Sequence, residues 1–274
     1  MQETVLITGC SSGIGRATAI AFLEEGWTVY ATARNPADIE TLGERGCELA
    51  TLDVTDDEDV DRVVNRILDE EGRIDCLVNN AGYAQFGPIE DVTVEDAKRQ
   101  YEVNVHGVHR LCRAVLPHMR REGDGTIINV SSVSGRLSYP IGGIYAGSKF
   151  ALEAMSDALR NEVRAHGVDV VVIQPGPVET QFGRRADEEI SRLDRTEAYE
   201  PFYAIWEDTG LLGGESPGAV SPGRVAEDVV NAASATKPRA RYPVGPVAQG
   251  TLLARFLPDA VRDRLTELVV RFVG

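Results

Sequence analysis

The sequence predicts a single α/β domain in which helices cover both faces of a doubly wound parallel sheet. Two observations predict this class. Short apolar runs rich in β-branched residues alternate along the chain with segments of helical period. A glycine cluster, TGCSSGIG at residues 8–15, separates the first apolar run from the first helical pattern. Glycines gather where another group approaches the backbone closely. The 274 residues are enough for one large domain with a buried core.

Seven strands are expected from the apolar runs, at residues 4–7, 28–32, 47–52, 76–79, 126–130, 168–173 and 240–244. One helix is expected directly after the glycine cluster. Another is expected over residues 56–72, where aliphatic residues recur on one face and acidic residues on the other. Parallel strands joined by right-handed crossovers bind ligands beyond their carboxyl ends. A functional site is therefore expected where the strands end.

Between residues 181 and 222 the alternation breaks down into an acidic segment that contains glycines and prolines, and we expect an irregular insertion there. Long insertions in a compact α/β domain usually serve as a substrate-binding lid. Aromatic residues occur along it at Phe182, Tyr199, Phe202, Tyr203 and Trp206. They either line an apolar substrate pocket or form a small core of the lid itself.

After the insertion we expect a helix near residues 223–235 and, over residues 243–274, a C-terminal helical extension. The last helix, near residues 259–272, is expected to have an apolar face made of Leu257, Val261, Leu265, Leu268 and Phe272. Acidic residues on this stretch and the scarcity of lysine oppose attraction to an anionic membrane. We expect the apolar face to pack against its own domain or against a second subunit.

The chain is strongly acidic, with a formal net charge of −15 from 43 acidic and 28 basic residues, and only three of the basic residues are lysines. This balance argues against nucleic acid as a partner. An acidic surface almost free of lysine is typical of halophilic organisms, in which salt screens self-repulsion. A merely acidic cytosolic protein from a GC-rich genome is the alternative.

No targeting, membrane or metal pattern is found in the sequence. No apolar stretch is long enough to span a bilayer, and no signal-peptide pattern precedes the first strand, so we expect a cytoplasmic protein. The four cysteines are scattered without a CxxC pair, and the four histidines lack an HExxH spacing. We expect reduced thiols and no metal site.

Five further motifs accompany the glycine cluster: NNAG at 79–82, NVHG at 104–107, NVSS at 129–132, YAGSK at 145–149 and PGPVET at 175–180. In this order and at these intervals, the six motifs resemble the short-chain dehydrogenase/reductase (SDR) family in its compact form, over about residues 3–240. The resemblance implies a Rossmann fold and an enzyme that interconverts a secondary alcohol and a ketone or aldehyde by hydride transfer with a nicotinamide cofactor.

The motif YAGSK places Tyr145 and Lys149 on one face of a helix. A tyrosine with its ordinary pKa of about 10 is a poor acid or base at neutral pH unless a cation stabilises its phenolate. The resemblance implies that Tyr145 exchanges the proton with the substrate oxygen and that Ser132 hydrogen-bonds this oxygen. It further implies that Lys149 lowers the pKa of the tyrosine and holds the nicotinamide ribose. Asn104 would hold a water of the proton relay.

The glycine cluster opens a helix whose free N–H groups and positive dipole end suit a pyrophosphate. Its GxxxGxG spacing differs from the general GxGxxG fingerprint. The resemblance implies that the cofactor contacts Gly9, Ser11, Ser12, Gly13, Ile14, Gly15, Arg34, Asp53, Val54, Asn80, Ala81, Gly82, Pro175, Gly176, Val178 and Thr180, together with Tyr145 and Lys149.

The end of the second strand predicts a preference for NADP(H) over NAD(H). NAD-binding relatives carry an acidic residue there, which hydrogen-bonds the adenosine ribose. In this sequence Ala33 takes that position and Arg34 follows it. A guanidinium matches the 2′-phosphate of NADP in charge and in geometry. The alternative is that Arg34 is an ordinary surface arginine.

The motifs define the substrate less closely. Val133, Tyr139 and Phe86 are candidates for an apolar pocket, and several motifs resemble those of relatives that act on steroids or retinoids, which favours a lipophilic small-molecule carbonyl compound. The competing hypothesis is a non-catalytic dinucleotide-binding sensor or scaffold on the same fold. Such proteins tend to lose the catalytic residues, which this chain retains. The resemblance also implies a homodimer or homotetramer.

If the acidic surface is a halophilic adaptation, enzyme activity and the melting temperature should both rise between low and multimolar KCl, because salt screens the repulsion between carboxylates. Activity and thermal unfolding measured across that KCl range test this expectation. Equal activity and equal melting temperatures at both ends of the range would contradict it.

Overall fold

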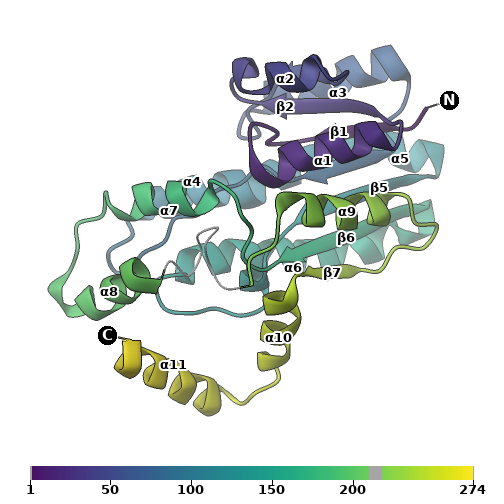
Figure 1. Cartoon of the computed structure of the whole chain (residues 1–274). Coiled ribbons are helices and arrows are strands. Elements are labelled where there is room, and N and C mark those ends of the chain that lie inside the picture. The colour runs from purple at the N-terminus through teal and green to yellow at the C-terminus, as the bar shows by residue number, and fades with distance from the viewer. Residues whose placement is uncertain (1, 210–217, 274) are drawn as a thin grey trace.

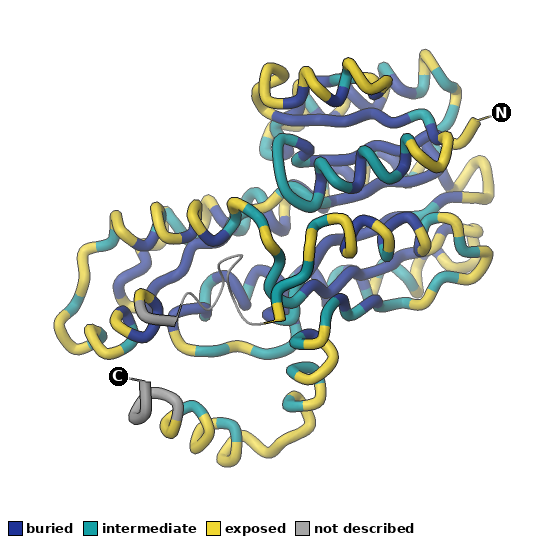
Figure 2. The backbone as a smooth tube through the Cα atoms, in the orientation of Figure 1, coloured by how far each residue is buried: buried dark blue, intermediate teal, exposed yellow. Residues whose placement is uncertain are grey.

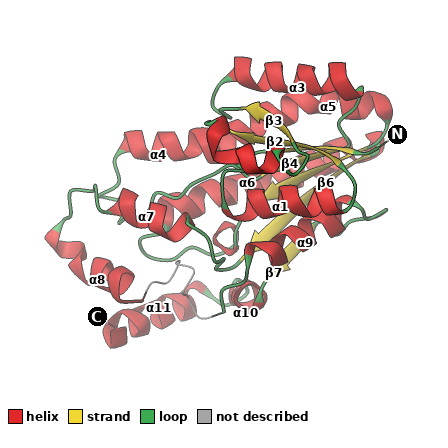
Figure 3. Ribbon diagram, turned by 45° about the horizontal axis from the view of Figure 1, so that its top comes forward, coloured by secondary structure: helices red, strands yellow, loops and turns green. Residues whose placement is uncertain are grey.

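The computed structural model describes residues 2–209 and 218–273, with side chains described in 2–207 and 218–268. Its seven parallel strands form one sheet in the order β3-β2-β1-β4-β5-β6-β7, with helices on both faces (Figures 1 and 3). The strands are β1 (Thr4–Ile7), β2 (Thr28–Ala33), β3 (Glu48–Thr51), β4 (Cys76–Asn79), β5 (Gly125–Val130), β6 (Val168–Pro175) and β7 (Arg241–Val244). The predicted fold class and its seven strands are confirmed.

The helices alternate with the strands as far as β6. They are α1 (Gly13–Glu24), α2 (Glu40–Gly43), α3 (Asp57–Glu71), α4 (Val94–Tyr101), α5 (Val108–Glu122), α6 (Gly143–Val163), α7 (Phe182–Ile190), α8 (Glu200–Thr209), α9 (Pro222–Ala233), α10 (Pro246–Ala254) and α11 (Asp259–Val273). A π-helical turn, Glu102–Gly107, joins α4 to α5. The helix over the aliphatic and acidic pattern is α3, which Asp56 caps by accepting hydrogen bonds from the backbone N–H groups of Glu58 and Asp59.

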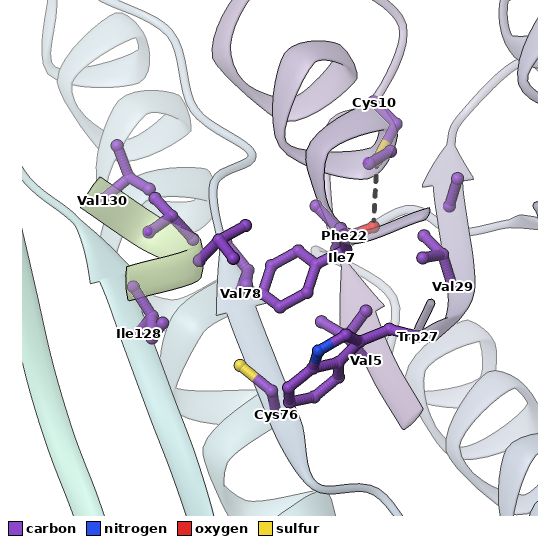
Figure 4. Close-up of a cluster of buried hydrophobic side chains, with 14 of the residues drawn as sticks. Val5, Ile7, Cys10, Phe22, Trp27, Val29, Cys76, Val78, Ile128 and Val130 are labelled. Atoms are coloured by element: carbon purple, nitrogen blue, oxygen red, sulfur yellow. Dashed lines mark hydrogen bonds between the residues drawn. The ribbon is translucent and has the colours of Figure 1, made fainter. Parts of the chain in front are cut away.

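Two apolar layers sandwich the sheet, so its strands are the most buried part of the chain (Figure 2). On one face α1 and α9 pack on the sheet. Phe22 and Trp27 meet edge to face there, with ring centroids 4.9 Å apart, beside Val5 and Val78 (Figure 4). On the other face, α3, α5 and α6 contribute side chains such as Ile67, Leu111 and Leu152. The buried strands are fixed in place and hold their carboxyl ends at one edge.

The direction in which the chain adds strands to the sheet reverses at β1, because β2 and β3 lie on one side of β1 and β4 lies on the other. The connections after β1 and after β4 therefore leave the sheet in opposite directions. This arrangement opens a crevice beyond the carboxyl ends of these two strands, where open α/β sheets bind their ligands. The glycine cluster lies at this point.

The sequence predicted an irregular segment between residues 181 and 222, and this prediction is wrong. The helices α7 and α8 make up most of the described part of the segment. Phe182, Ala186 and Ile190 recur every four residues and give α7 one apolar face within an acidic sequence. This spacing was the signal for a helix in the sequence. Residues 210–217 lie outside the described residues.

The aromatic residues of this segment form a core with residues of the main domain. Tyr203 and Trp206 of α8 are buried with Phe86 and Ile141, and the ring centroids of Trp206 and Phe86 lie 4.7 Å apart. Phe182, Tyr199 and Phe202 pack against this cluster while remaining partly exposed. The aromatic residues therefore form a core, but not one that belongs to the inserted segment alone, because it also includes Tyr145 of the main domain.

Polar contacts tie the same segment to the loop before α4. Asp91 is 9% exposed and accepts hydrogen bonds from the hydroxyls of Thr196 and Tyr203, both at 2.6 Å. Burial opposes ionisation of Asp91, but these hydrogen bonds hold its pKa below the usual value. Nearby, the Tyr199 hydroxyl donates to the exposed Glu90 at 2.6 Å.

The C-terminal extension consists of β7, α10 and α11, and α11 runs back beside α8 (Figure 1). Part of its expected apolar face is exposed, since Val261, Leu265 and Leu268 are between 41% and 51% exposed. Leu257 is 38% exposed, and the side chain of Phe272 lies outside the described residues.

Replacing Asp91 by alanine should loosen the segment of α7 and α8 without unfolding the domain, because it removes the acceptor of three hydrogen bonds. We expect backbone amides in residues 197–207 to exchange with deuterium at least about tenfold faster. Hydrogen exchange with mass spectrometry measures this. Glu90→Ala, which removes one surface acceptor, is the matched control. Equal exchange in the two variants would refute the role given to Asp91.

Candidate active site

The turn between β1 and α1 brings the backbone close to the loop after β4. Gly9 has φ +72°, and a Cβ atom there would lie 2.9 Å from the Cα of Ala81. Gly13 has φ +56°, and a Cβ atom there would lie 3.0 Å from Cγ2 of Thr180. Both positions require glycine because of the backbone conformation and the lack of space.

The N-terminus of α1 is open to a ligand. Ser12 is the N-cap residue, yet no side chain caps the free N–H groups of the first turn. These donors and the helix dipole therefore face the adjacent cavity, which suits a phosphate group. The residues present at this turn thus fit the pyrophosphate of a dinucleotide.

A cavity of about 960 Å³ lies beyond the carboxyl ends of the strands and gathers almost all of the predicted site residues. Those that line it are Gly9, Ser11, Ser12, Gly13, Ile14, Arg34, Asp53, Val54, Asn80, Ala81, Gly82, Ser132, Tyr145, Lys149, Pro175, Gly176, Val178 and Thr180. Segments as far apart in the sequence as Gly9 and Glu189 meet here. Gly15 and Asn104 are not among the lining residues.

Gly15 allows α1 to approach the glycine turn and the loop after β4. A Cβ atom at Gly15 would lie 2.4 Å from Nδ2 of Asn80 and from the carbonyl oxygen of Gly9. Asn80 uses this amide to donate to the carbonyls of Thr8 at 2.8 Å and Gly9 at 3.1 Å. The Asn80 side chain therefore fixes the shape of the glycine turn.

Asn104 is buried in the π-helical turn and binds the loop after β4 from behind. Its amide donates to the carbonyl of Tyr83 at 2.9 Å, and its Oδ1 accepts from the backbone N–H of Tyr83 at 3.2 Å. The amide also donates to Oγ of Ser148 at 3.2 Å. A Cβ atom at Gly82 would lie 2.9 Å from Oδ1 of Asn104. Asn104 therefore joins this loop to α6.

Ser132 and Tyr145 meet at the floor of the cavity. Ser132 ends the segment after β5, and its Oγ accepts a hydrogen bond from the backbone N–H of Ser134 at 3.1 Å. Tyr145 is 6% exposed, and its ring lies 5.2 Å from that of Phe86 and 5.8 Å from that of Phe182, measured between centroids. Ser132, rather than the adjacent Ser131, is the hydroxyl that interacts with Tyr145.

Lys149 lies one turn after Tyr145 and is also buried. Its Nζ donates to the carbonyl of Val130 at 3.0 Å and lies 5.9 Å from the centroid of the Tyr145 ring. Ser148, between them on α6, donates to the carbonyl of Tyr145 at 2.7 Å. The buried face of α6 thus presents a phenol and an amine to one cavity.

Burial opposes the charged form of both side chains. It raises the pKa of Tyr145, and the nearby Tyr139 raises it further, whereas Ser132 lowers it. Burial lowers the pKa of Lys149 to about 8, against the opposing effect of the Glu153 carboxylate. At neutral pH the phenol is therefore protonated and the amine is mostly cationic, so the pair can deliver a proton.

Several cavity residues were not identified from the sequence. Among them are Tyr83, Val103, Arg99, Arg185, Glu188 and Glu189. Arg99 of α4 donates to the Tyr83 hydroxyl at 3.0 Å and to Glu189 of α7 at 2.9 Å, so it links the two helices across the mouth of the cavity. In the sequence the four charged residues, Arg99, Arg185, Glu188 and Glu189, belong to helix patterns with no motif around them, whereas Tyr83 and Val103 directly adjoin the NNAG and NVHG motifs.

The three residues that the sequence suggested for an apolar substrate pocket, Phe86, Tyr139 and Val133, do not all lie together. Phe86 and Tyr139 belong to the apolar cluster around Tyr145, and the Tyr139 hydroxyl lies 3.2 Å from Oγ of Ser134. Val133 is outside both this cluster and the cavity lining.

Within residues 2–209 and 218–273, no group of three His, Cys, Asp or Glu residues is arranged to hold a metal ion. No helix in the same described part of the chain has the length and apolar character needed to cross a membrane.

Residues 3–191 match the family model described as short chain dehydrogenase. The 3-ketodihydrosphingosine reductase of Bacteroides thetaiotaomicron is 36% identical over 261 residues, which cover 94% of both chains. The NADPH-dependent 3-dehydrocapnine reductase of Ornithobacterium rhinotracheale is 34% identical over 95% of this chain and 94% of its own. A short-chain dehydrogenase structure from Streptomyces avermitilis superposes with a TM-score of 0.84 at 35% identity, over 100% of this chain and 99% of that one.

The family model and these relatives span the cavity, the glycine turn and the buried face of α6. The chain belongs to the short-chain dehydrogenase family of oxidoreductases.

Proposed function

We propose that this protein is an NADP(H)-dependent oxidoreductase that interconverts a lipophilic secondary alcohol and the corresponding ketone or aldehyde. The observation that carries the proposal is the meeting of Ser132, Tyr145 and Lys149 in one cavity with the glycine turn and Arg34. A proton donor, a hydrogen-bond donor and a dinucleotide cradle are the parts that carbonyl reduction requires.

In the reductive direction, Tyr145 donates its hydroxyl proton to the carbonyl oxygen of the substrate, while the Ser132 hydroxyl hydrogen-bonds this oxygen as negative charge develops on it. A nicotinamide cofactor held by these residues would supply the hydride. Lys149 stabilises the resulting phenolate by its charge and holds the nicotinamide ribose. Asn104, which lies in the π-helical turn, completes the proton relay by holding a water at its main-chain carbonyl.

The lining beside Tyr145 favours a lipophilic substrate. Phe182 lines the cavity, and its ring lies 5.8 Å from that of Tyr145, measured between centroids. Phe86 and Trp206 extend this aromatic cluster behind the Tyr145 ring, so an apolar ligand would gain from burial beside it. The names of the two reductases among the relatives each denote reduction of a ketone. We assign the lid function to residues 181–222.

The preference for NADP(H) rests on Arg34. This exposed residue follows β2 directly and lines the cavity, and Ala33 stands where an acidic residue would bind the ribose of NAD. One of the relatives is named as NADPH-dependent. The Asp53 carboxylate also lines the cavity, but it accepts hydrogen bonds from both the backbone and the hydroxyl of Thr55.

The remaining expectations belong to this proposal. We place the enzyme in the cytoplasm of a halophilic organism as a homodimer or homotetramer. The non-catalytic alternative, a dinucleotide-binding sensor, predicts cofactor binding without turnover and is separated from an enzyme by the experiments below.

Replacing Tyr145 by phenylalanine should lower kcat/KM for carbonyl reduction by at least about 10³-fold, because the proton donor is lost while the ring remains. NADPH oxidation with a panel of ketones, aldehydes and quinones measures this effect. Binding of NADPH, followed by fluorescence, should stay unchanged. Tyr139→Phe is the matched control, because it removes a neighbouring hydroxyl outside the proposed reaction. Normal turnover by the Tyr145 variant would refute the assignment.

Replacing Arg34 by alanine should reduce the preference for NADPH over NADH by about tenfold or more, because a charge-assisted contact to the 2′-phosphate is lost. The ratio of kcat/KM for the two cofactors measures the preference. Arg45→Ala provides a control, since Arg45 is an exposed arginine paired with Glu24 and lies outside the cavity lining. An unchanged ratio in the Arg34 variant would show that the 2′-phosphate is bound elsewhere.

A further inference from the structure

Glu153 is a buried carboxylate that the proposed reaction does not use. It lies on α6, four residues after Lys149 and eight after Tyr145, and is 3% exposed. Residues at this spacing share one face of a helix. A buried carboxylate is costly unless its oxygens are bound, so its surroundings indicate what it does.

Both oxygens of Glu153 are held by side chains from the end of the sheet. Oε1 accepts from Nε2 of Gln174 on β6 at 2.7 Å, and Oε2 accepts from Nε of Arg241 on β7 at 2.9 Å. Arg136 lies 3.9 Å from Oε2. These contacts bind both carboxylate oxygens and fix the side chain in one orientation.

The same side chain supports the turn that carries Ser132. A Cβ atom at Gly135, the last residue of this turn, would lie 2.9 Å from Cγ of Glu153 and 3.1 Å from the carbonyl oxygen of Lys149. Only glycine lets the turn rest so closely on α6. The Glu153 side chain is therefore packed between the turn of Ser132 and the two last strands.

The charge of Glu153 acts on Lys149. The titratable groups that face Lys149 are Tyr145 and Glu153 on its own helix, with Tyr139 beyond the tyrosine. Arg136 and Arg241 approach Glu153 from the other side. Both carboxylate oxygens of Asp157 bind Arg241 at 2.7 Å, so the charge of this arginine is shared between two acids. Asp157 is also paired with Arg160 at 2.8 Å. Glu153 is thus a carboxylate one helical turn from the buried amine, and its effect on Lys149 raises the pKa of that amine.

We propose that Glu153 is a positioning residue of the active site, which keeps Lys149 cationic inside the protein and holds the turn of Ser132 against α6. The inference rests on the proposed function for its kinetic consequence, but its effect on Lys149 does not depend on turnover. Glu153 does not touch the reacting atoms in this assignment, and it acts through Lys149 and the turn.

The variant Glu153→Gln tests the proposal, because it keeps the shape and an acceptor for Gln174 but removes the charge. In the pH profile of kcat/KM for carbonyl reduction, the active form has both Tyr145 and Lys149 protonated. Loss of a nearby negative charge lowers the pKa of each. We therefore expect the alkaline limb of the profile to move to lower pH by about one unit.

Two further variants separate charge from structure. Asp157→Asn changes the partner of Arg241 one helical turn farther from Lys149, so the alkaline limb of the pH profile should stay in place. Glu153→Asp retains the charge and should keep the limb near its wild-type position. A Glu153→Gln enzyme that is slower and less stable at every pH, with an unmoved limb, would show a merely structural role and overturn the proposal.

A direct titration distinguishes failure of this inference from failure of the proposed function. The chain has three lysines, Lys98, Lys149 and Lys237, so a protein labelled with ¹³C at lysine Cε gives three NMR signals. Lys98→Arg and Lys237→Arg variants assign them. We expect the pKa of Lys149 to be lower in Glu153→Gln than in the wild type. Equal pKa values of Lys149 in the two proteins would overturn the inference, whether or not a substrate is found. A lower pKa of Lys149 in the variant, together with no turnover by the wild type, would contradict only the proposed enzymatic function.

Discussion

The architecture of the site depends on how closely α6 packs against β5 and β6. This contact buries one face of a 21-residue helix, and on that face stand Tyr145, Lys149 and Glu153 in successive turns. Apolar burial elsewhere on the helix, at Leu152 and Val163, provides the stabilisation that holds polar groups in a poorly hydrated place. Moving the helix outward would hydrate the lysine and separate the tyrosine from Ser132.

Burial changes the proton affinities of Tyr145 and Lys149. A phenol and an amine in water would have opposite charges only at high pH, and neither would be directed at a substrate. Inside the protein, burial pushes both towards their neutral forms, and neighbouring groups then restore the charge of the lysine. The carbonyl of Val130 and the carboxylate of Glu153 serve the amine in this way. The protein thus adjusts the proton affinity of both groups through burial and through the neighbouring side chains.

The sequence predicted those parts of the fold and the site that depend on specific local residues. Positions 9 and 13 need glycine because their φ angles are positive and their neighbours are close. The strands were predictable because a strand that is buried on both faces needs a continuous apolar run. Contacts between distant polar residues could not be predicted in this way. Asp91 meets Thr196 across 105 residues and Glu153 meets Arg241 across 88, and neither pair has a spacing that marks it. The helix α7 was missed because its acidic and glycine-bearing surroundings concealed a four-residue apolar period.

The ring of Tyr145 lies between Phe86, which belongs to the main domain, and Phe182, which opens α7. The surroundings of this ring therefore come from two separate parts of the chain, and a shift of α7 would change them on one side only. If residues 181–222 act as the lid proposed above, the rate of product release would depend on that helix, while the glycine turn would stay as it is.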